Sequence, residues 1–263
     1  MRDFLWDILS ATAFTMEKAS AYGTVHLGFL LPGLAVCLLA AWKLRKLGDR
    51  GIKRLLLCCG AFLFLTELYK QLFHCVYLWE GEYNWGIFPF HFCSVPMYFS
   101  LIAPMLPKGR AKRYMYSFMG LYNLLGGGLA LFEPSGLLHV YWTLTVHAFL
   151  WHLMLVFIGL VLLLSGNAGD YRGATLCFLA LCVVAFCINL AFREASGGAL
   201  NMFFVGPSDS PIIVFREISE TFGWYVSTAI YVPAVCLGAW LIHRIKLESD
   251  KKHKRIALGE KKV

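Results

Sequence analysis

Seven long apolar stretches constrain the fold of this chain more than any motif does. About 20 apolar residues in helical form cross the roughly 30 Å hydrocarbon layer of a bilayer. The chain is 59% hydrophobic and only 15% charged, with a mean hydropathy of +0.63, whereas soluble proteins carry about 25% charged residues. We therefore predict an all-α, polytopic membrane protein built as a seven-transmembrane helix bundle. The expected spans are 24–42, 55–79, 87–106, 114–133, 140–165, 173–193 and 222–243.

Lys and Arg are unequally distributed between the connections. Six lie in 43–54, four in 107–113, one in 166–172 and eight after residue 243, so 19 of the 24 share one side of the predicted bundle. Cytoplasmic loops are enriched in Lys and Arg. We therefore predict an N-terminus outside and a C-terminus in the cytoplasm. The chain is expected to be one domain, 1–263, with a short basic tail at 244–263.

The net charge of +8 does not indicate a nucleic-acid partner, because the excess lies in the loops and the tail. Anionic membrane lipids are a better explanation for it. The nine cysteines fall inside the predicted spans and form no CxxC pair or zinc-ligand spacing, so they are interpreted mainly as small buried hydrophobes. We expect no cofactor and no metal ion, and the sequence indicates no particular protein partner.

A histidine and a thiol lie between two prolines in the apolar segment 87–96, at His91 and Cys93. Ionisable side chains within hydrocarbon are costly, on the order of 2.5 to 3.5 kcal/mol for the charged types, and usually face a protein interior or a wet cavity. This segment is therefore the first candidate site. Its helix is expected to begin near Pro89 and to kink at Pro96, because proline removes a backbone hydrogen bond.

A polar stripe marks the span at 55–79. Glu67, Lys70, Gln71 and His74 follow a spacing of i, i+3, i+4 and i+7, which places them on one face of a helix. Two interpretations remain open. The first two residues form an internal ion pair that holds the bundle together, or they provide the electrostatic frame of a site.

Other polar residues fall at the same level of the predicted bundle. His147 and His152 are five residues apart on one helix, about 140° round it, so they cannot both point directly at one spot. The loop 194–221 contains Asn201 and is expected to form a structured or re-entrant cap. The alternating direction of the helices places most of these residues in the outer half, which predicts a cavity there. Its expected lining is Glu67, Lys70, His74, His91, Cys93, Asn123, His147 and Asn189.

The chemistry of such a cavity depends on the pairing of Cys93. A cysteine nucleophile needs a base within about 2.6–3.2 Å, and His91 lies roughly 200° away on a regular helix. His147 or His74 is a more plausible base, and a pair of histidines acting with water is an alternative. An inert core thiol and hydrogen-bonded core histidines remain the structural interpretations. A zinc site of His74, His91 and His147 lacks an HExxH-like spacing.

Several runs resemble the bacterial YwaF-type integral membrane proteins, where Pro-Leu-His-Leu-Cys-like and Asn-Tyr-Met-Phe-Leu-like runs recur in the same order. They are Pro-Phe-His-Phe-Cys-Ser at 89–94, the helix of His147, Asn-Met-Phe-Phe at 201–204 and Gly-Trp-Tyr at 223–225. That family is distantly related to the vertebrate transmembrane protein 164, a lipid acyltransferase that acts through a cysteine and a histidine. More remotely it is similar to androgen-induced multipass lipid hydrolases. The resemblance implies that His91, Cys93 and His147 are the catalytic positions, and that the protein spans a bacterial cell membrane several times.

The first functional hypothesis is a membrane-embedded lipid acyltransferase or acyl-lipid hydrolase. An amide, from Asn123 or Asn201, would donate to the oxyanion. The alternative is a non-enzymatic binder or transporter of a small amphiphile, contacted by Glu67 and Lys70. A structural partner protein is a third hypothesis, but it leaves the buried histidines unexplained. The expected substrate contacts are Glu67, Lys70, His74, Asn123, His152, Asn189 and Asn201.

Overall fold

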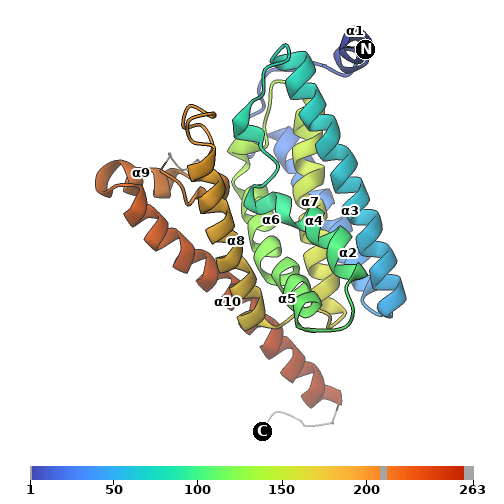
Figure 1. Ribbon diagram of the computed structural model, residues 1–263. Helices are drawn as coiled ribbons and strands as arrows, with labels where there is room; N and C mark the ends of the chain where they lie inside the picture. The colour runs from blue at the N-terminus through green and yellow to red at the C-terminus, as the bar shows by residue number, and fades with distance from the viewer. Residues whose placement is uncertain (1, 208–211, 258–263) are drawn as a thin grey trace.

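Helices dominate the protein. The computed structural model describes residues 2–207 and 212–257, and within them the only strand-like feature is an isolated bridge between Thr15 and Tyr141. The predicted all-α class is confirmed (Figure 1). The helices are α1 (Arg2–Ser10), α2 (Thr24–Leu44), α3 (Asp49–Leu72), α4 (Val95–Ile102), α5 (Arg110–Phe118), α6 (Leu124–Phe132), α7 (Trp142–Leu164), α8 (Tyr171–Ala191), α9 (Ile213–Phe222) and α10 (Trp224–Ala257).

Five helical segments in the described part are long and apolar enough to cross a membrane. They are Thr24–Leu44, Arg110–Phe132, Trp142–Leu164, Tyr171–Ala191 and Trp224–Lys252. The count of seven spans, like the orientation, stays a prediction. The two expected spans outside this set differ for physical reasons: α3 carries charged residues at both ends, and the segment after it, Phe92–Met105, is a shorter apolar helix.

The helix expected at 87–106 begins later than the sequence indicated. Pro89 lies in irregular backbone, a short 3₁₀ turn covers Phe92–Ser94, and α4 starts at Val95. Pro96 therefore occupies the first turn of α4, where the missing N–H removes no helical hydrogen bond. The predictions of a start at Pro89 and a kink at Pro96 were wrong.

The long helix α7 forms the centre of the bundle and packs against α2, α3 and α6. Close approach between α6 and its neighbours depends on glycine. A Cβ on Gly126 would lie 2.5 Å from the ring of Phe92, and one on Gly127 would lie 3.2 Å from the backbone oxygen of His152. Small residues allow such contacts between membrane helices. The glycine run thus explains how α6 reaches both α7 and the segment around Phe92.

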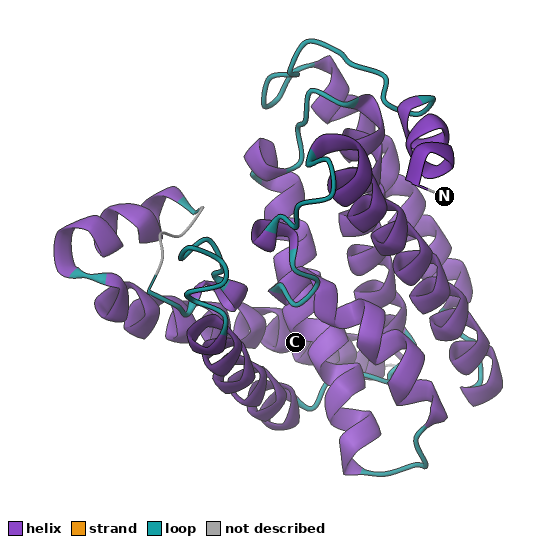
Figure 2. Ribbon diagram, turned by 45° about the horizontal axis from the view of Figure 1, so that its top comes forward, coloured by secondary structure: helices purple, strands orange, loops and turns teal. Residues whose placement is uncertain are grey.

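The C-terminal helices α8, α9 and α10 stand on one side of the molecule (Figures 1 and 2), and α10 packs mainly against α9. The segment between α8 and α10, expected to be a structured or re-entrant cap, contains a short turn at Met202–Phe204 and then α9 in its described part. Residues 208–211 of that loop lie outside the described residues, as do 258–263 of the basic tail.

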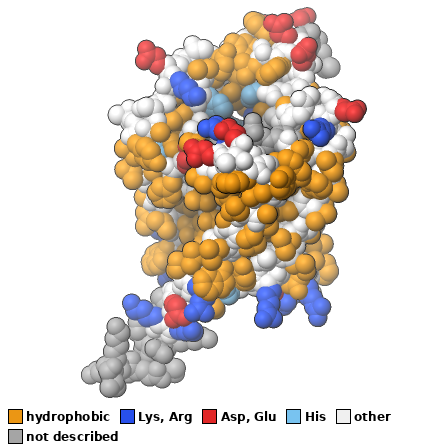
Figure 3. Space-filling model, turned by 90° about the vertical axis from the view of Figure 1, so that its left-hand side faces the viewer, with side chains coloured by type: hydrophobic (Ala, Val, Ile, Leu, Met, Phe, Trp, Pro, Cys, Tyr) orange, Lys and Arg blue, Asp and Glu red, His pale blue; other side chains and the backbone are white. Residues whose placement is uncertain are grey.

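The surface shows the pattern that a bilayer requires. On the face drawn in Figure 3, a belt of hydrophobic side chains crosses the middle, Lys and Arg gather at one end and carboxylates at the other. At the carboxylate end, α1 packs on the segment Phe73–Leu78 and exposes Phe4, Trp6 and Ile8. Exposed large apolar side chains on a short helix are suited to a membrane interface, so we expect α1 to lie along it.

Candidate functional site

The polar stripe on α3 forms a compact network. Lys70 Nζ lies 2.8 Å from Glu67 Oε2, and both side chains are largely buried, with exposed fractions of 19% and 6%. Gln71 donates through Nε2 to Glu67 Oε1 at 2.7 Å and to the backbone oxygen of Ile87 at 2.7 Å. Gln71 therefore links the ion pair to the loop that precedes α4.

That loop presents His91 on one side and its aromatic neighbours on the other. His91 Nε2 lies 2.9 Å from the backbone oxygen of Gly86, so a proton on Nε2 would be donated to that carbonyl. Phe90 and Phe92 instead contact the ring of Phe203, with centroids 5.9 and 5.6 Å apart. Because His91 and Cys93 lie in non-helical and 3₁₀ backbone, the 200° separation expected for a regular helix does not apply to them.

Trp151 on α7 connects two of the predicted catalytic residues. Its ring stacks on that of His147, with centroids 5.5 Å apart, and its Nε1 donates to the backbone oxygen of Cys93 at 3.0 Å. His147 also lies against the backbone of Thr66 on α3, and its buried Nε2 has no hydrogen-bond partner among the residues that the structure describes. Sequence reasoning missed Trp151, although its i+4 spacing from His147 was a usable signal.

The Lys70 ammonium is near enough to act electrostatically on five of the predicted site residues. They lie in the π-helical turn Phe73–Leu78 that follows α3, in the segment before α4 and in α7. These are His74, His91, Cys93, His147 and His152. The name Lys70 cluster is used below for these five residues together with Glu67 and Lys70. Histidine atoms are visible in a recess above the hydrophobic belt in Figure 3.

His139, in the turn before α7, is a further histidine near this cluster that the sequence analysis missed. Its backbone N–H and oxygen both bond the hydroxyl of Thr145, at 3.0 and 3.2 Å. Burial lowers the pKa of His139, and the positive charges of Lys18 and Lys70 lower it further. The imidazole is therefore held neutral beside the ammonium. Its position just before the start of the His147 helix was the available signal.

The thiol of Cys93 has no hydrogen bond to a histidine among the described residues. Its neighbours are Ser94 and the charges of Glu67 and Lys70. His152 is also engaged elsewhere, since Nδ1 lies 2.8 Å from the backbone oxygen of Ala148. The structure thus places Cys93 and the histidines in one cluster without a ready-made Cys–His pair.

Asn123 lies deeper, where α5 passes into α6. It is buried, and its Nδ2 lies 3.4 Å from the backbone oxygen of Phe92, while Oδ1 is buried without a partner. The helix widens at this point into a π-helical turn, Met119–Asn123. Single π turns are often found at functional sites. Asn123 therefore borders the Lys70 cluster from beneath the Phe92 turn.

Asn189 and Asn201 fix the loop after α8. Asn189 accepts from the N–H of Met202 at 2.7 Å and donates to its oxygen at 3.0 Å, and Asn201 accepts from the N–H of Gly206 at 3.0 Å. The turn they hold includes Phe203, whose φ of 56° is unusual for a bulky residue. Both amides thus support the Phe203 ring contact, and their expected contact with substrate stays a prediction.

Comparison with known proteins agrees with this arrangement. The TMEM164 family matches residues 21–243, which include all of the Lys70 cluster. The chain belongs to the TMEM164 family. The relationship to transmembrane protein 164 expected from the sequence is thereby confirmed, whereas the YwaF-type subgroup stays a prediction. No curated protein and no solved structure matches the chain.

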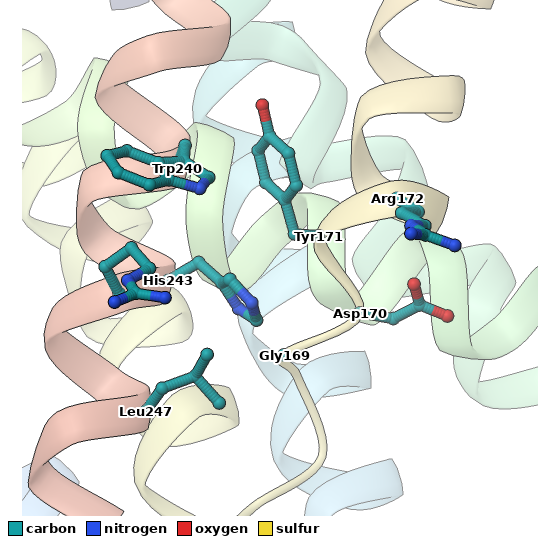
Figure 4. Close-up of a pocket in the computed structure, with 8 residues that line it drawn as sticks. Gly169, Asp170, Tyr171, Arg172, Trp240, His243 and Leu247 are labelled. Carbon is teal, nitrogen blue, oxygen red and sulfur yellow. The ribbon is translucent and has the colours of Figure 1, made fainter.

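Two pockets of this TMEM164 family member lie at the opposite, basic end of the bundle. One, of about 430 Å³, lies between the start of α8 and α10 (Figure 4). The ring of His243 stacks there on Tyr171, with centroids 5.7 Å apart, and Arg244 lies over Trp240. The other pocket, of about 500 Å³, lies between the starts of α3 and α5. Neither is lined by a predicted site residue.

Proposed function

We propose that this protein is a membrane-embedded enzyme that transfers or hydrolyses the acyl chains of lipid esters at the Lys70 cluster. The observation that carries this proposal is that Trp151 joins the backbone of Cys93 to the ring of His147. Gln71 in turn joins the buried Glu67–Lys70 pair to the loop that leads to Cys93. Ionisable residues within membrane segments are functional-site candidates by default. Membrane lipids are the expected substrates, because the chain has helices long and apolar enough to lie within a bilayer.

The proposed first step forms an acyl-enzyme. His147 takes the proton from the thiol of Cys93, and the thiolate sulfur attacks the carbonyl carbon of a lipid ester. The ester C–O bond breaks, and the leaving oxygen takes the proton back from the imidazolium of His147, which releases a lysolipid. A thiolate needs such a base to form. The unpartnered Nε2 of His147 is suited to this role.

The second step returns the enzyme to its starting state. His147 takes a proton from the hydroxyl of an acceptor lipid, or from water, and that oxygen attacks the thioester carbonyl. The C–S bond breaks and Cys93 regains its proton from the imidazolium. A lipid acceptor makes the reaction acyl transfer, and water makes it hydrolysis. Lys70 and the amide of Asn123 would stabilise the negative oxygen formed in both steps.

The thiol of Cys93 and the imidazole of His147 need not lie within hydrogen-bond distance before substrate binds. Catalytic hydrogen bonds are often long in the free enzyme and tighten in the complex. Trp151 contacts both residues, through its ring and its N–H. It is therefore expected to set their relative position when an ester enters.

The test is to incubate purified protein with mixed phospholipids and to measure acyl adducts and changed lipid species. Cys93→Ala is expected to abolish both adduct and turnover, and His147→Ala to slow acylation by about 10²- to 10⁴-fold with unchanged expression. Cys177→Ala, another half-buried thiol, is the matched control. Turnover that survives Cys93→Ala but fails in His91→Ala or His147→Ala would replace the thiolate by a histidine-activated water.

A non-enzymatic binder or transporter of a small amphiphile is the second candidate, favoured by the buried Glu67–Lys70 pair. Such a pair can contact a charged headgroup or carry a proton without any thiol chemistry. A wild-type protein that alters no lipid, yet binds an amphiphile in a manner that depends on Glu67 or Lys70, would establish this candidate and refute the enzyme.

A further inference from the structure

A basic pocket lies at the end of the bundle opposite the Lys70 cluster. It has a volume of about 500 Å³ and is bounded by the starts of α3 and α5, the turn that follows α4 and the loop before α8. Asp49, at the start of α3, is 21 positions before Lys70, a separation of about 31 Å along a helix. The pocket is thus separate from the proposed catalytic site. Five cationic side chains line it: Arg50, Lys53, Lys108, Lys112 and Arg113.

Only two of these five cations have a carboxylate partner among the described residues. Lys108 Nζ lies 2.5 Å from Asp49 Oδ2, and Arg113 Nε lies 2.8 Å from Asp170 Oδ2. Lys112 Nζ donates to the backbone oxygens of Leu106 and Pro104, at 3.4 and 3.5 Å, and lies over the ring of Tyr116, 5.5 Å from its centroid. The charge of Lys112 acts on Asp49 without a direct ion pair, and Arg50 and Lys53 have no carboxylate partner among the described residues.

Two helices begin at this pocket, and neither has a side-chain cap. The residue before α3 is Gly48 and the residue before α5 is Gly109, and neither can supply a capping oxygen. The first N–H groups of a helix have no partner within it, and the helix dipole adds partial positive charge there. The backbone N–H groups of the two helix starts and the five cationic side chains therefore all favour the binding of an anion.

We propose that this pocket binds a phosphomonoester group, presented by an anionic lipid headgroup or by a soluble phosphate. A phosphomonoester carries about −1.5 to −2 charge at pH 7 and three strong acceptor oxygens. That charge matches the cations left without a carboxylate, and the guanidinium of Arg50 can bind two phosphate oxygens at once. On the predicted orientation the pocket opens at the cytoplasmic leaflet, where anionic lipids are concentrated.

The topological preference for cytoplasmic Lys and Arg explains why cations occur in these loops. It does not explain why five of them surround one cavity at two uncapped helix starts. Two nearby cations provide a control, since Lys43 at the end of α2 and Arg54 in α3 do not line the pocket. If the pocket binds an anion, removing two of its cations should weaken binding more than removing two cations outside it. If these cations serve only membrane topology, the two removals should have equal effects.

The experiment measures binding by the purified full chain after its reconstitution into nanodiscs. The probes are nanodiscs of phosphatidylcholine with and without phosphatidic acid, and inorganic phosphate and glycerophosphate in solution. The double variant Arg50→Gln/Lys53→Gln is expected to weaken binding by at least about tenfold, since each charge-assisted hydrogen bond is worth that much. The double variant Lys43→Gln/Arg54→Gln is expected to change binding by less than about twofold. Asp49→Asn is expected to tighten binding, because it frees Lys108.

The opposite signs for Asp49→Asn and Arg50→Gln/Lys53→Gln guard against an effect of misfolding, which would weaken binding in both. Saturable binding of phosphatidic acid alone identifies a lipid headgroup as the ligand, whereas equal binding of glycerophosphate identifies a soluble phosphate. Equal losses in the two double variants, or no saturable binding by any probe, would refute the pocket. His147→Ala is expected to leave binding unchanged, so this proposal and the acyl-transfer proposal fail separately.

Discussion

The indole N–H of Trp151 donates a 3.0 Å hydrogen bond to the backbone carbonyl of Cys93. This contact joins the central helix α7, which carries His147, to the turn that precedes α4. It also places the thiol-bearing residue at a fixed distance from the ring that stacks on His147.

Trp151→Phe should therefore reduce turnover more than it reduces stability. The substitution keeps an aromatic ring against His147 but leaves the Cys93 carbonyl without its donor, which costs about 1–3 kcal/mol when the group is buried. Turnover is expected to fall by about tenfold or more, because small displacements at a reacting centre have large effects. Thermal unfolding and a lipid assay measure the two effects. Trp142→Phe, at the exposed start of α7, is the control, and an equal loss of turnover there would contradict the positioning role.

Glu67 and Lys70 offer a test of a buried ion pair. Glu67→Gln or Lys70→Met leaves one charge without its partner, and we expect a loss of roughly 3–5 kcal/mol, while the double variant should be milder. Thermal stability in detergent is the measurement. Single and double variants that keep their stability but lose activity would show that the pair contacts substrate directly and does not mainly hold the bundle together.

Asn189→Ala should destabilise the loop after α8. It removes both bonds to Met202 and leaves two buried backbone groups unpaired, at about 1–3 kcal/mol each. Asn189→Asp keeps the acceptor for the Met202 N–H and should lose less. Limited proteolysis of 194–207 together with thermal unfolding distinguishes the two variants. Equal stability of the Ala and Asp variants would show that the Met202 bonds contribute nothing.

The predicted orientation places 43–54, 107–113 and the basic tail in the cytoplasm. Single cysteines introduced into a variant without native cysteines report this through their access to a membrane-impermeant label. Ser135→Cys, in the exposed turn between α6 and α7, should label from outside, as should a cysteine at Ser208, which lies outside the described residues. Lys46→Cys should label only after the membrane is opened. The reverse pattern would invert the orientation.

The sequence predicted five spans well because their apolar windows are long and uninterrupted, and the structure starts each of them within about four residues of the expected position. Boundaries of that precision are usual for periodic segments. The stretch before α4 was predicted poorly. Two prolines bracket it, either of which can occupy a first turn, and the sequence alone does not say which one does.

Residue type and depth predicted the candidate site only in part. The polar stripe on α3 and the position of His147 identified the Lys70 cluster, since charged side chains in a membrane segment usually pair with one another inside the protein. Asn189 and Asn201 have the same residue type as Asn123 but bond to loop backbone. No periodicity distinguishes an amide that holds a turn from one that borders a site. That distinction depends on the path of 201–206, a loop without a repeating pattern.

The π-helical turn at Met119–Asn123 has a consequence for comparing relatives. Its backbone bonds close one residue further along than those of an α-helix, so the residues of α6 are rotated by about 100° relative to an uninterrupted continuation of α5. A relative that lacks one residue here would form a regular helix and turn its equivalent of Asn123 away from the Phe92 carbonyl. Alignments within the TMEM164 family should therefore allow a single-residue gap between 119 and 123. Members with and without this gap are expected to differ in whether an amide borders the Lys70 cluster.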